Sequence, residues 1–98
     1  MTRVLHLSLH RQWFDEIANG TKTTEFRTIK PYWTKRLEGR IFDEVWFKNG
    51  YAKDAPFMRV EWKGLILTSY HGEKKYGIKL GAILELKHYP LDLNSSKK

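Results

Sequence analysis

Short stretches of the chain alternate between apolar and polar residues, which is the pattern of β-strands with one buried face. In residues 3–10, Leu5, Leu7 and Leu9 share one side of the expected strand, and polar side chains share the other. Similar stretches, rich in β-branched and aromatic residues, predict further strand segments over residues 21–29, 41–48, 57–62, 65–70 and 82–89. Gly64 lies between two of these segments and predicts a bulge or bend.

Two segments have helical periodicity instead. In residues 11–19, Trp13 and Ile17 share one stripe, which predicts a helix whose apolar side packs in the core. Gly20 follows this segment, as expected where a helix ends and the chain reverses. Residues 32–37, which follow a proline, form a second and shorter candidate helix.

The order of these elements contains neither a repeat nor a regular alternation of strands and helices. Five or six short strands with one or two short helices predict an α+β fold, either a small mixed or antiparallel β-barrel or a strongly coiled sheet. Residues 71–81 are polar and flanked by glycines, which predicts a loop before the last strand. We expect a single domain over residues 1–93 and a disordered polar tail over residues 94–98.

Charge narrows the class of partner. The formal net charge is +7, and residues 22–40 alone contain six basic residues against two acidic ones, a net charge of +4. Clustered positive charge attracts polyanions through the release of their counterions. The charge pattern therefore favours RNA or a nucleotide as partner, although a solvated basic surface without a ligand is the alternative.

Composition makes several other kinds of site unexpected. The chain has no cysteine, which removes disulfides and thiolate metal sites. It shows no signal-peptide pattern, and no apolar run approaches the ~20 residues that span a bilayer, so we expect a soluble cytoplasmic protein without membrane contact. His6 and His10 share one strand face but lie about 13 Å apart, too far to bind one metal ion directly. We expect neither a metal nor a cofactor.

The densest group of charged residues follows Gly20, where Lys22, Glu25 and Arg27 lie within six residues of one another. In a regular strand Glu25 and Arg27 point to the same face, with Cα atoms about 7 Å apart. Lys22 would point to the opposite face. It can join the other two only from the turn before the strand or across a bulge.

These three side chains suit binding as well as catalysis. Arg27 offers a planar fork for a phosphate or carboxylate. Lys22, partly desolvated beside Glu25, is a candidate base or oxyanion stabiliser, and Glu25 is a candidate proton carrier. A surface ladder of ion pairs would have the same spacing and is the alternative.

Aromatic and basic residues also lie close together in the connector that follows. Tyr32 and Trp33 lie near Lys30, an arrangement suited to stacking on bases beside a phosphate contact. Trp33 and Leu37 are also four residues apart, so that they could instead anchor a short helix to the sheet. Ser8, at the end of the first strand, completes the candidate binding residues.

The arrangement Gly20-x-Lys22-x-x-Glu25-x-Arg27, preceded by an apolar strand and an amphipathic helix, resembles the signature of the ASCH domain, a family of PUA-like β-barrels. The specific match covers residues 5–27. The resemblance implies a barrel with a cleft whose floor carries Lys22, Glu25 and Arg27. It also implies a protein that binds RNA, or that acts on RNA or nucleotides.

Some small ASCH proteins are amidohydrolases that deacetylate N-acetylated cytidine, and at least one resembles a ribonuclease in activity. The amidohydrolases have a lysine equivalent to Lys22, a threonine at the position of Glu25, and a later glutamate for which Glu61 and Glu73 are candidates. The first expectation is therefore an RNA- or nucleotide-binding module. A hydrolase acting on a modified nucleoside or on RNA is the alternative, and a protein-interaction domain with exposed aromatic residues is the third.

Overall fold

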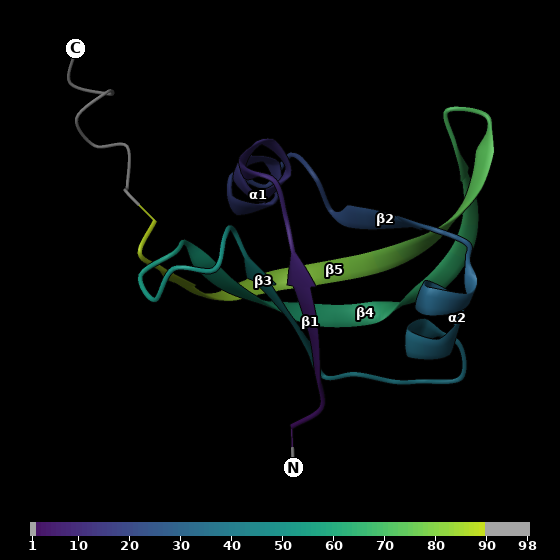
Figure 1. The fold of residues 1–98 in the computed structure, drawn as a ribbon, viewed down its shortest axis with the longest axis horizontal. Helices are drawn as coiled ribbons and strands as arrows, with labels where there is room; N and C mark the ends of the chain where they lie inside the picture. Colours follow the sequence, from purple (N-terminus) through teal and green to yellow (C-terminus); the bar gives the residue numbers. More distant parts are fainter. Residues whose placement is uncertain (1, 90–98) are drawn as a thin grey trace.

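The computed structural model describes residues 2–89 and contains five strands and two helices within that range (Figure 1). In chain order they are β1 (Val4–Ser8), α1 (Arg11–Ala18), β2 (Thr24–Thr28), α2 (Pro31–Leu37), β3 (Glu44–Lys48), β4 (Phe57–Tyr70) and β5 (Glu73–Lys87). The α+β class and both predicted helices are confirmed. Neither helix is long and apolar enough to cross a membrane. The predicted tail, residues 94–98, lies outside the described residues.

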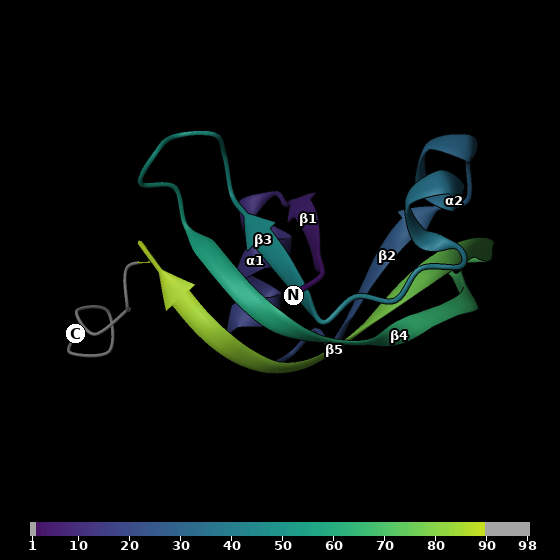
Figure 2. The same cartoon turned by 90° about the horizontal axis from the view of Figure 1, so that it is seen from below.

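The strands form one mixed sheet in the order β1-β3-β4-β5-β2. β1 runs parallel to β3, and the other neighbouring pairs are antiparallel. β1 and β2 are the two edges and share no backbone pairing within residues 2–89, so the sheet is not closed into the expected barrel. Figure 2 shows β4 and β5 curving beneath the molecule, with β1 and β2 above the same side of this curve.

The prediction of a loop over residues 71–81 is wrong, because β5 already begins at Glu73. His71 and Gly72, with φ of 53° and 81°, form a two-residue turn between the paired residues Tyr70 and Glu73. Two positive φ values in succession are typical of the tight turns that match the twist of a hairpin. The strand therefore starts at Glu73, nine residues before the predicted start, and its charged residues are accommodated because they belong to a paired, solvent-facing ribbon.

Two predicted segments, residues 57–62 and 65–70, are one continuous strand, β4. Its pairing with β5 shifts register at three places, the last between Trp62 and Gly64. The predicted irregularity at Gly64 is thus confirmed. Register shifts of this kind bend a strand and increase its twist, which accounts for the curvature of the β4–β5 ribbon.

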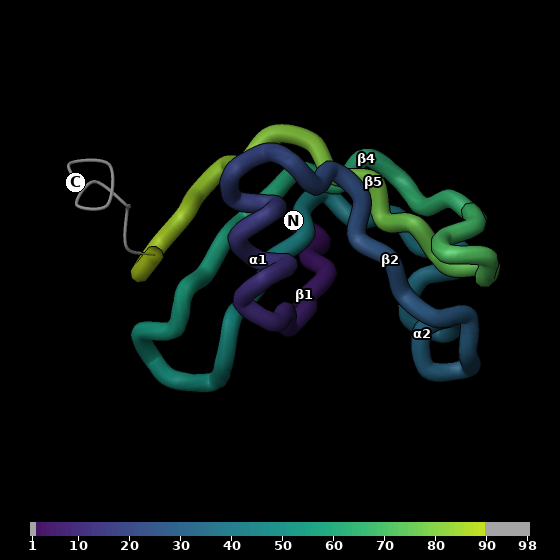
Figure 3. Tube along the Cα trace, turned by 90° about the horizontal axis from the view of Figure 1, so that it is seen from above, coloured from purple at the N-terminus to yellow at the C-terminus, as the bar shows by residue number. Residues whose placement is uncertain are grey.

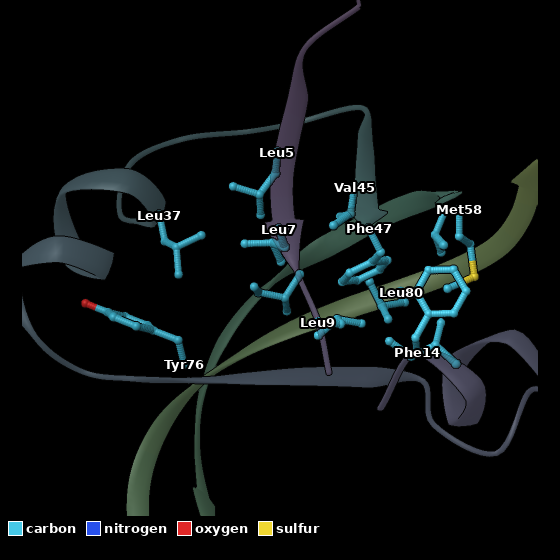
Figure 4. Close-up of a cluster of buried hydrophobic side chains, with 13 residues drawn as sticks. Leu5, Leu7, Leu9, Phe14, Leu37, Val45, Phe47, Met58, Tyr76 and Leu80 are labelled. Carbon is cyan, nitrogen blue, oxygen red and sulfur yellow. The ribbon is translucent and has the colours of Figure 1, made fainter. Parts of the chain in front are cut away.

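The buried hydrophobic side chains form one cluster, to which the sheet and both helices contribute (Figure 4). Leu5, Leu7 and Leu9 are buried, as their alternation predicts. On α1 the buried residues are Phe14 and Ile17. The other core side chains come from β3, β4, β5 and α2: Leu37, Val45, Phe47, Met58, Val60, Tyr76, Ile78 and Leu80.

Candidate functional site

The turn after α1 decides where Lys22 lies. Gly20 has φ of +86°, a conformation open to glycine at little cost, and it reverses the chain. The backbone N–H groups of Thr21 and Lys22 then both donate to the carbonyl of Glu16 at 3.0 Å. β2 begins only at Thr24, so Lys22 lies in the turn before the strand. The condition under which Lys22 joins Glu25 and Arg27 is therefore met.

The three side-chain ends meet at the Glu25 carboxylate. Lys22 Nζ lies 3.6 Å from Glu25 Oε1, and Arg27 Nη2 lies 2.9 Å from Glu25 Oε2. The exposed fractions of the side chains are 12% for Lys22, 7% for Glu25 and 18% for Arg27. A surface ion-pair ladder would be far more exposed, so the three residues form a largely buried group, called here the charged cluster.

Burial dominates the protonation of Glu25. Removal of the carboxylate from water raises the pKa of Glu25 above its ordinary value, and the positive charges of Arg27 and Lys22 oppose this effect only in part. Such a carboxyl group keeps its proton more readily than an exposed one. It is suited to proton transfer and to donating or accepting a hydrogen bond inside a cleft.

Arg27 connects the two edges of the sheet. Besides Glu25, its Nη2 donates to the backbone carbonyl of Ser8 at 3.2 Å, so it crosses the opening between β2 and β1. The guanidinium carbon lies 4.8 Å from the centre of the Trp33 ring. Its Nε is buried and has no hydrogen-bond partner among the described residues. Contacts with an anion, a carbonyl and a ring therefore hold the guanidinium in one orientation.

Aromatic rings surround Lys22 in the same way. Its Nζ lies 5.2 Å from the centre of the Trp13 ring and 4.9 Å from that of Phe26. Ring faces attract cations, and more strongly where water is excluded. Trp13 is half-buried, whereas the sequence pattern places it in the core stripe of the helix. It packs against the core and also lines a cleft.

This cleft has a volume of about 650 Å³ and opens between β1, β2 and α2. Of the predicted site residues, Ser8, Glu25, Arg27 and Trp33 line it. Lys22, Lys30 and Tyr32 are not among its lining residues. Lys22 reaches the cleft only through Glu25, Lys30 is exposed, and Tyr32 instead stacks under the Arg36 guanidinium at 3.6 Å.

Several lining residues are unexpected from the sequence: Trp13, Asn49, Tyr51 and Lys75. Asn49 Nδ2 donates to the Leu9 carbonyl at 2.9 Å, which fixes the β3–β4 loop against the end of β1. Lys75 comes from the segment predicted as a loop. A bond between a side chain and a backbone group 40 positions away leaves no local pattern in a sequence. Of the four residues, only Trp13 could have been found from the sequence, because it lies one helical turn before Ile17 on the apolar stripe.

Trp33 is held in place by the docking of α2. The Tyr76 hydroxyl on β5 donates to Glu38 Oε2 at 2.6 Å and accepts from Thr34 Oγ1 at 2.6 Å. The ring of Trp33 packs against the core, as expected of a residue that anchors the helix, and it also forms one wall of the cleft, while stacking on a base stays a prediction. Figure 3 shows α1 and α2 at opposite ends of β2, so the two tryptophan-bearing helices flank the charged cluster.

The remaining candidate acids and His6 lie away from the cleft, whereas His10 is one of the residues that line it. Glu61 accepts the backbone N–H of Ala82 at 2.9 Å and Glu73 pairs with Lys75 at 3.2 Å; neither lines the cleft. The His6 ring packs edge-on against Trp46. Residues 2–89 contain no group of three or more histidines or acids that could hold a metal ion.

Comparison of the chain with protein-family models, with curated proteins and with solved structures found no match.

Proposed function

We propose that this chain is an ASCH-type, PUA-like domain that binds RNA or a nucleotide in the cleft between β1, β2 and α2. The observation that supports this most directly is the buried Glu25 carboxylate, held between Lys22 and Arg27 beside a cleft walled by Trp13 and Trp33. Oriented polar groups between aromatic walls are what an unpaired base requires, since its edge needs hydrogen bonds and its faces need stacking.

The contacts of each residue indicate its role in binding. Arg27 lines the cleft and is rigidly held, so it donates to an oxygen or ring nitrogen of the ligand. Glu25 presents its carboxyl group to a base amino group or carbonyl. Lys22 lies behind Glu25 and holds the carboxyl in position, because it does not itself line the cleft. Trp33 and Trp13 provide the stacking surfaces.

The first test measures binding of nucleotides and short RNAs by calorimetry for the wild type, Lys22→Ala and Arg27→Ala. Loss of a charge-assisted hydrogen bond costs about 1.5–3 kcal/mol, so Arg27→Ala should bind roughly 10- to 100-fold more weakly. Lys22→Ala should lose less, since it acts through Glu25. Binding to RNA should also weaken steeply with added salt.

Thermal unfolding of each variant shows whether it remains folded, and Lys53→Ala, on the exposed β3–β4 loop, serves as the matched control. Wild-type affinity in a folded Arg27→Ala protein, or RNA binding that is indifferent to salt, would contradict the proposal.

A hydrolase is the second candidate, because the pKa of Glu25 is raised and Lys22 lies 3.6 Å away. In deacetylation of an N-acetylated cytidine, water adds to the acetyl carbonyl and the C–N bond breaks. Glu25 would take the proton from water and pass it to the leaving nitrogen, with Arg27 stabilising the oxyanion. Neither Glu61 nor Glu73 lines the cleft, so the hydrolase has less support than the binding function. Release of acetate in the same samples would reverse that order.

A further inference from the structure

Two more hollows lie along β1, on the N-terminal side of the cleft. The cleft itself is lined by residues 8–10, at the end of β1. A hollow of about 450 Å³ is lined by Leu5 and His6, and another of about 480 Å³ by Arg3 and Val4. These last two share Arg40 and Phe42, so they adjoin. His6, in the first of these hollows, and Ser8, in the cleft, are two residues apart, which is about 7 Å along a strand. The cleft therefore lies directly next to the two hollows. We call the two hollows together the β1 groove.

The β1 groove is strongly basic. Its other walls are α2 and the segment after it, and its cations are Arg3, Lys35, Arg36 and Arg40. No carboxylate lines either hollow. None of the four side chains pairs with a carboxylate in the part of the chain that the structure describes.

Two of these cations are also held in place. Arg36 Nη1 donates to the Tyr32 carbonyl at 3.2 Å, and Arg40 Nε donates to the Lys35 carbonyl at 3.1 Å. Each guanidinium keeps further N–H groups beyond these bonds, since it carries five in all. The groove therefore presents oriented donors to an anion, with no carboxylate among its lining residues.

In the cleft, by contrast, the positive charges are paired with carboxylates. Its Arg27 is already paired with Glu25, and its Lys75 pairs with Glu73 at 3.2 Å. The cleft thus offers hydrogen bonds and stacking, but little uncompensated charge for a phosphate. A ligand that uses both surfaces must carry an unpaired base at one end and a chain of negative charges at the other.

We infer that the β1 groove binds the phosphodiester backbone of a single-stranded nucleic acid whose base occupies the cleft. The inference rests on the proposed function and narrows its ligand from nucleotides in general to an oligonucleotide. A double helix does not fit, because its bases are not free to enter the cleft.

The test compares two ligands, a fluorescently labelled single-stranded RNA octamer and a nucleoside monophosphate, by anisotropy and calorimetry. The groove variant is Lys35→Gln/Arg40→Gln, and the control is Lys53→Gln/Lys79→Gln, at two exposed lysines outside the groove. Each lowers the net charge by two, from +7 to +5, so a general charge effect is the same in both.

The groove variant should bind the octamer about tenfold more weakly, the sum of two exposed ionic contacts. The slope of log affinity against log salt should fall by about 1.4, or 0.7 per lost phosphate contact. Its affinity for the monophosphate should stay at the wild-type value, and the control variant should match the wild type for both ligands.

Equal octamer binding by the groove and control variants would overturn the inference, as would a monophosphate affinity that falls in parallel. So would polyglutamate that competes as well as an RNA of equal charge, because the occupant would then be an acidic peptide. The proposed function fails separately, if Arg27→Ala binds the monophosphate and the octamer like the wild type.

Discussion

Glu25 is the residue in which burial and charge compete most directly. Its carboxylate has lost nearly all contact with water, which costs more free energy than two nearby cations return, and this raises its pKa. The cations are themselves largely desolvated, with Lys22 against Trp13 and Phe26 and Arg27 against Trp33. The charged cluster is therefore maintained at a cost in stability, which is expected of a functional site more than of a stabilising ion pair.

The raised pKa of Glu25 should make the free energy of unfolding depend on pH. The pKa of Glu25 in the folded state lies above its ordinary value of 4.5. In the pH window between these two pKa values, the folded state binds more protons than the unfolded state. The contribution of Glu25 is fully present below that ordinary value and is lost as pH rises through the folded pKa. We expect the difference in free energy of unfolding, wild type minus Glu25→Gln, to fall with pH across this window.

Urea unfolding of both proteins at a series of pH values measures this difference, and shifts of other groups, such as the lowered pKa of Asp15, cancel in it. A difference that rises with pH would show that the two cations outweigh burial, and a constant difference would show that they balance it. Either result would contradict the prediction.

At the scale of elements, the site depends on how two connections are made. The glycine turn after α1 places Lys22 before β2 and not in it, which brings its side chain to the face of Glu25. After β2, the short α2 has neither a side-chain cap at its start nor the length to be stable alone. It is held to β5 by the Tyr76 hydroxyl, which contacts both Thr34 and Glu38.

Tyr76→Phe should therefore loosen α2 specifically. It removes two hydrogen bonds from a side chain that is completely buried, which should lower the free energy of unfolding by about 1–2 kcal/mol. Backbone amides of α2 should exchange with deuterium faster, while those of α1 stay as in the wild type. Denaturant unfolding and hydrogen exchange measure the two effects. Tyr51→Phe, on an exposed ring, is the control, and equal stability of the two variants would refute the docking role.

At the scale of the whole molecule, an open and strongly curved sheet brings its two edge strands near each other without pairing them. Arg27 crosses the remaining opening to the Ser8 carbonyl, and the cleft lies along the same opening. The curvature follows from the register shifts in β4, and the shared core under β1 and α1 maintains it. The site is thus a property of the sheet as a whole.

Core truncation should accordingly be severe. Phe14 is completely buried where α1 meets the sheet, and Phe14→Ala should lower the free energy of unfolding by about 3–5 kcal/mol. That is a large share of the roughly 5–15 kcal/mol typical of a small domain. Leu67→Ala, at a side chain 67% exposed on β4, should change it by no more than about 0.5 kcal/mol. Thermal and denaturant unfolding compare the two, and a mild effect at Phe14 would mean that α1 contributes little to the core.

The sequence by itself determined the features that depend on near neighbours along the chain. The apolar alternation of Leu5, Leu7 and Leu9 predicted a buried strand face, and Gly20 marked the helix end. The requirement that Lys22 lie in the turn also followed from the period of a strand, because side-chain direction is a local property of the backbone.

Only the tertiary structure decided what lies across from these elements. Asn49 and Lys75 reach the cleft from positions far along the chain, and Trp13 proved to be a wall as well as a core residue. The first nine residues of β5 were missed because pairing with β4 overrides the polar composition of residues 71–81. Whether the sheet closes was equally undetermined, since closure depends on the accumulated bend of all five strands and on no single segment.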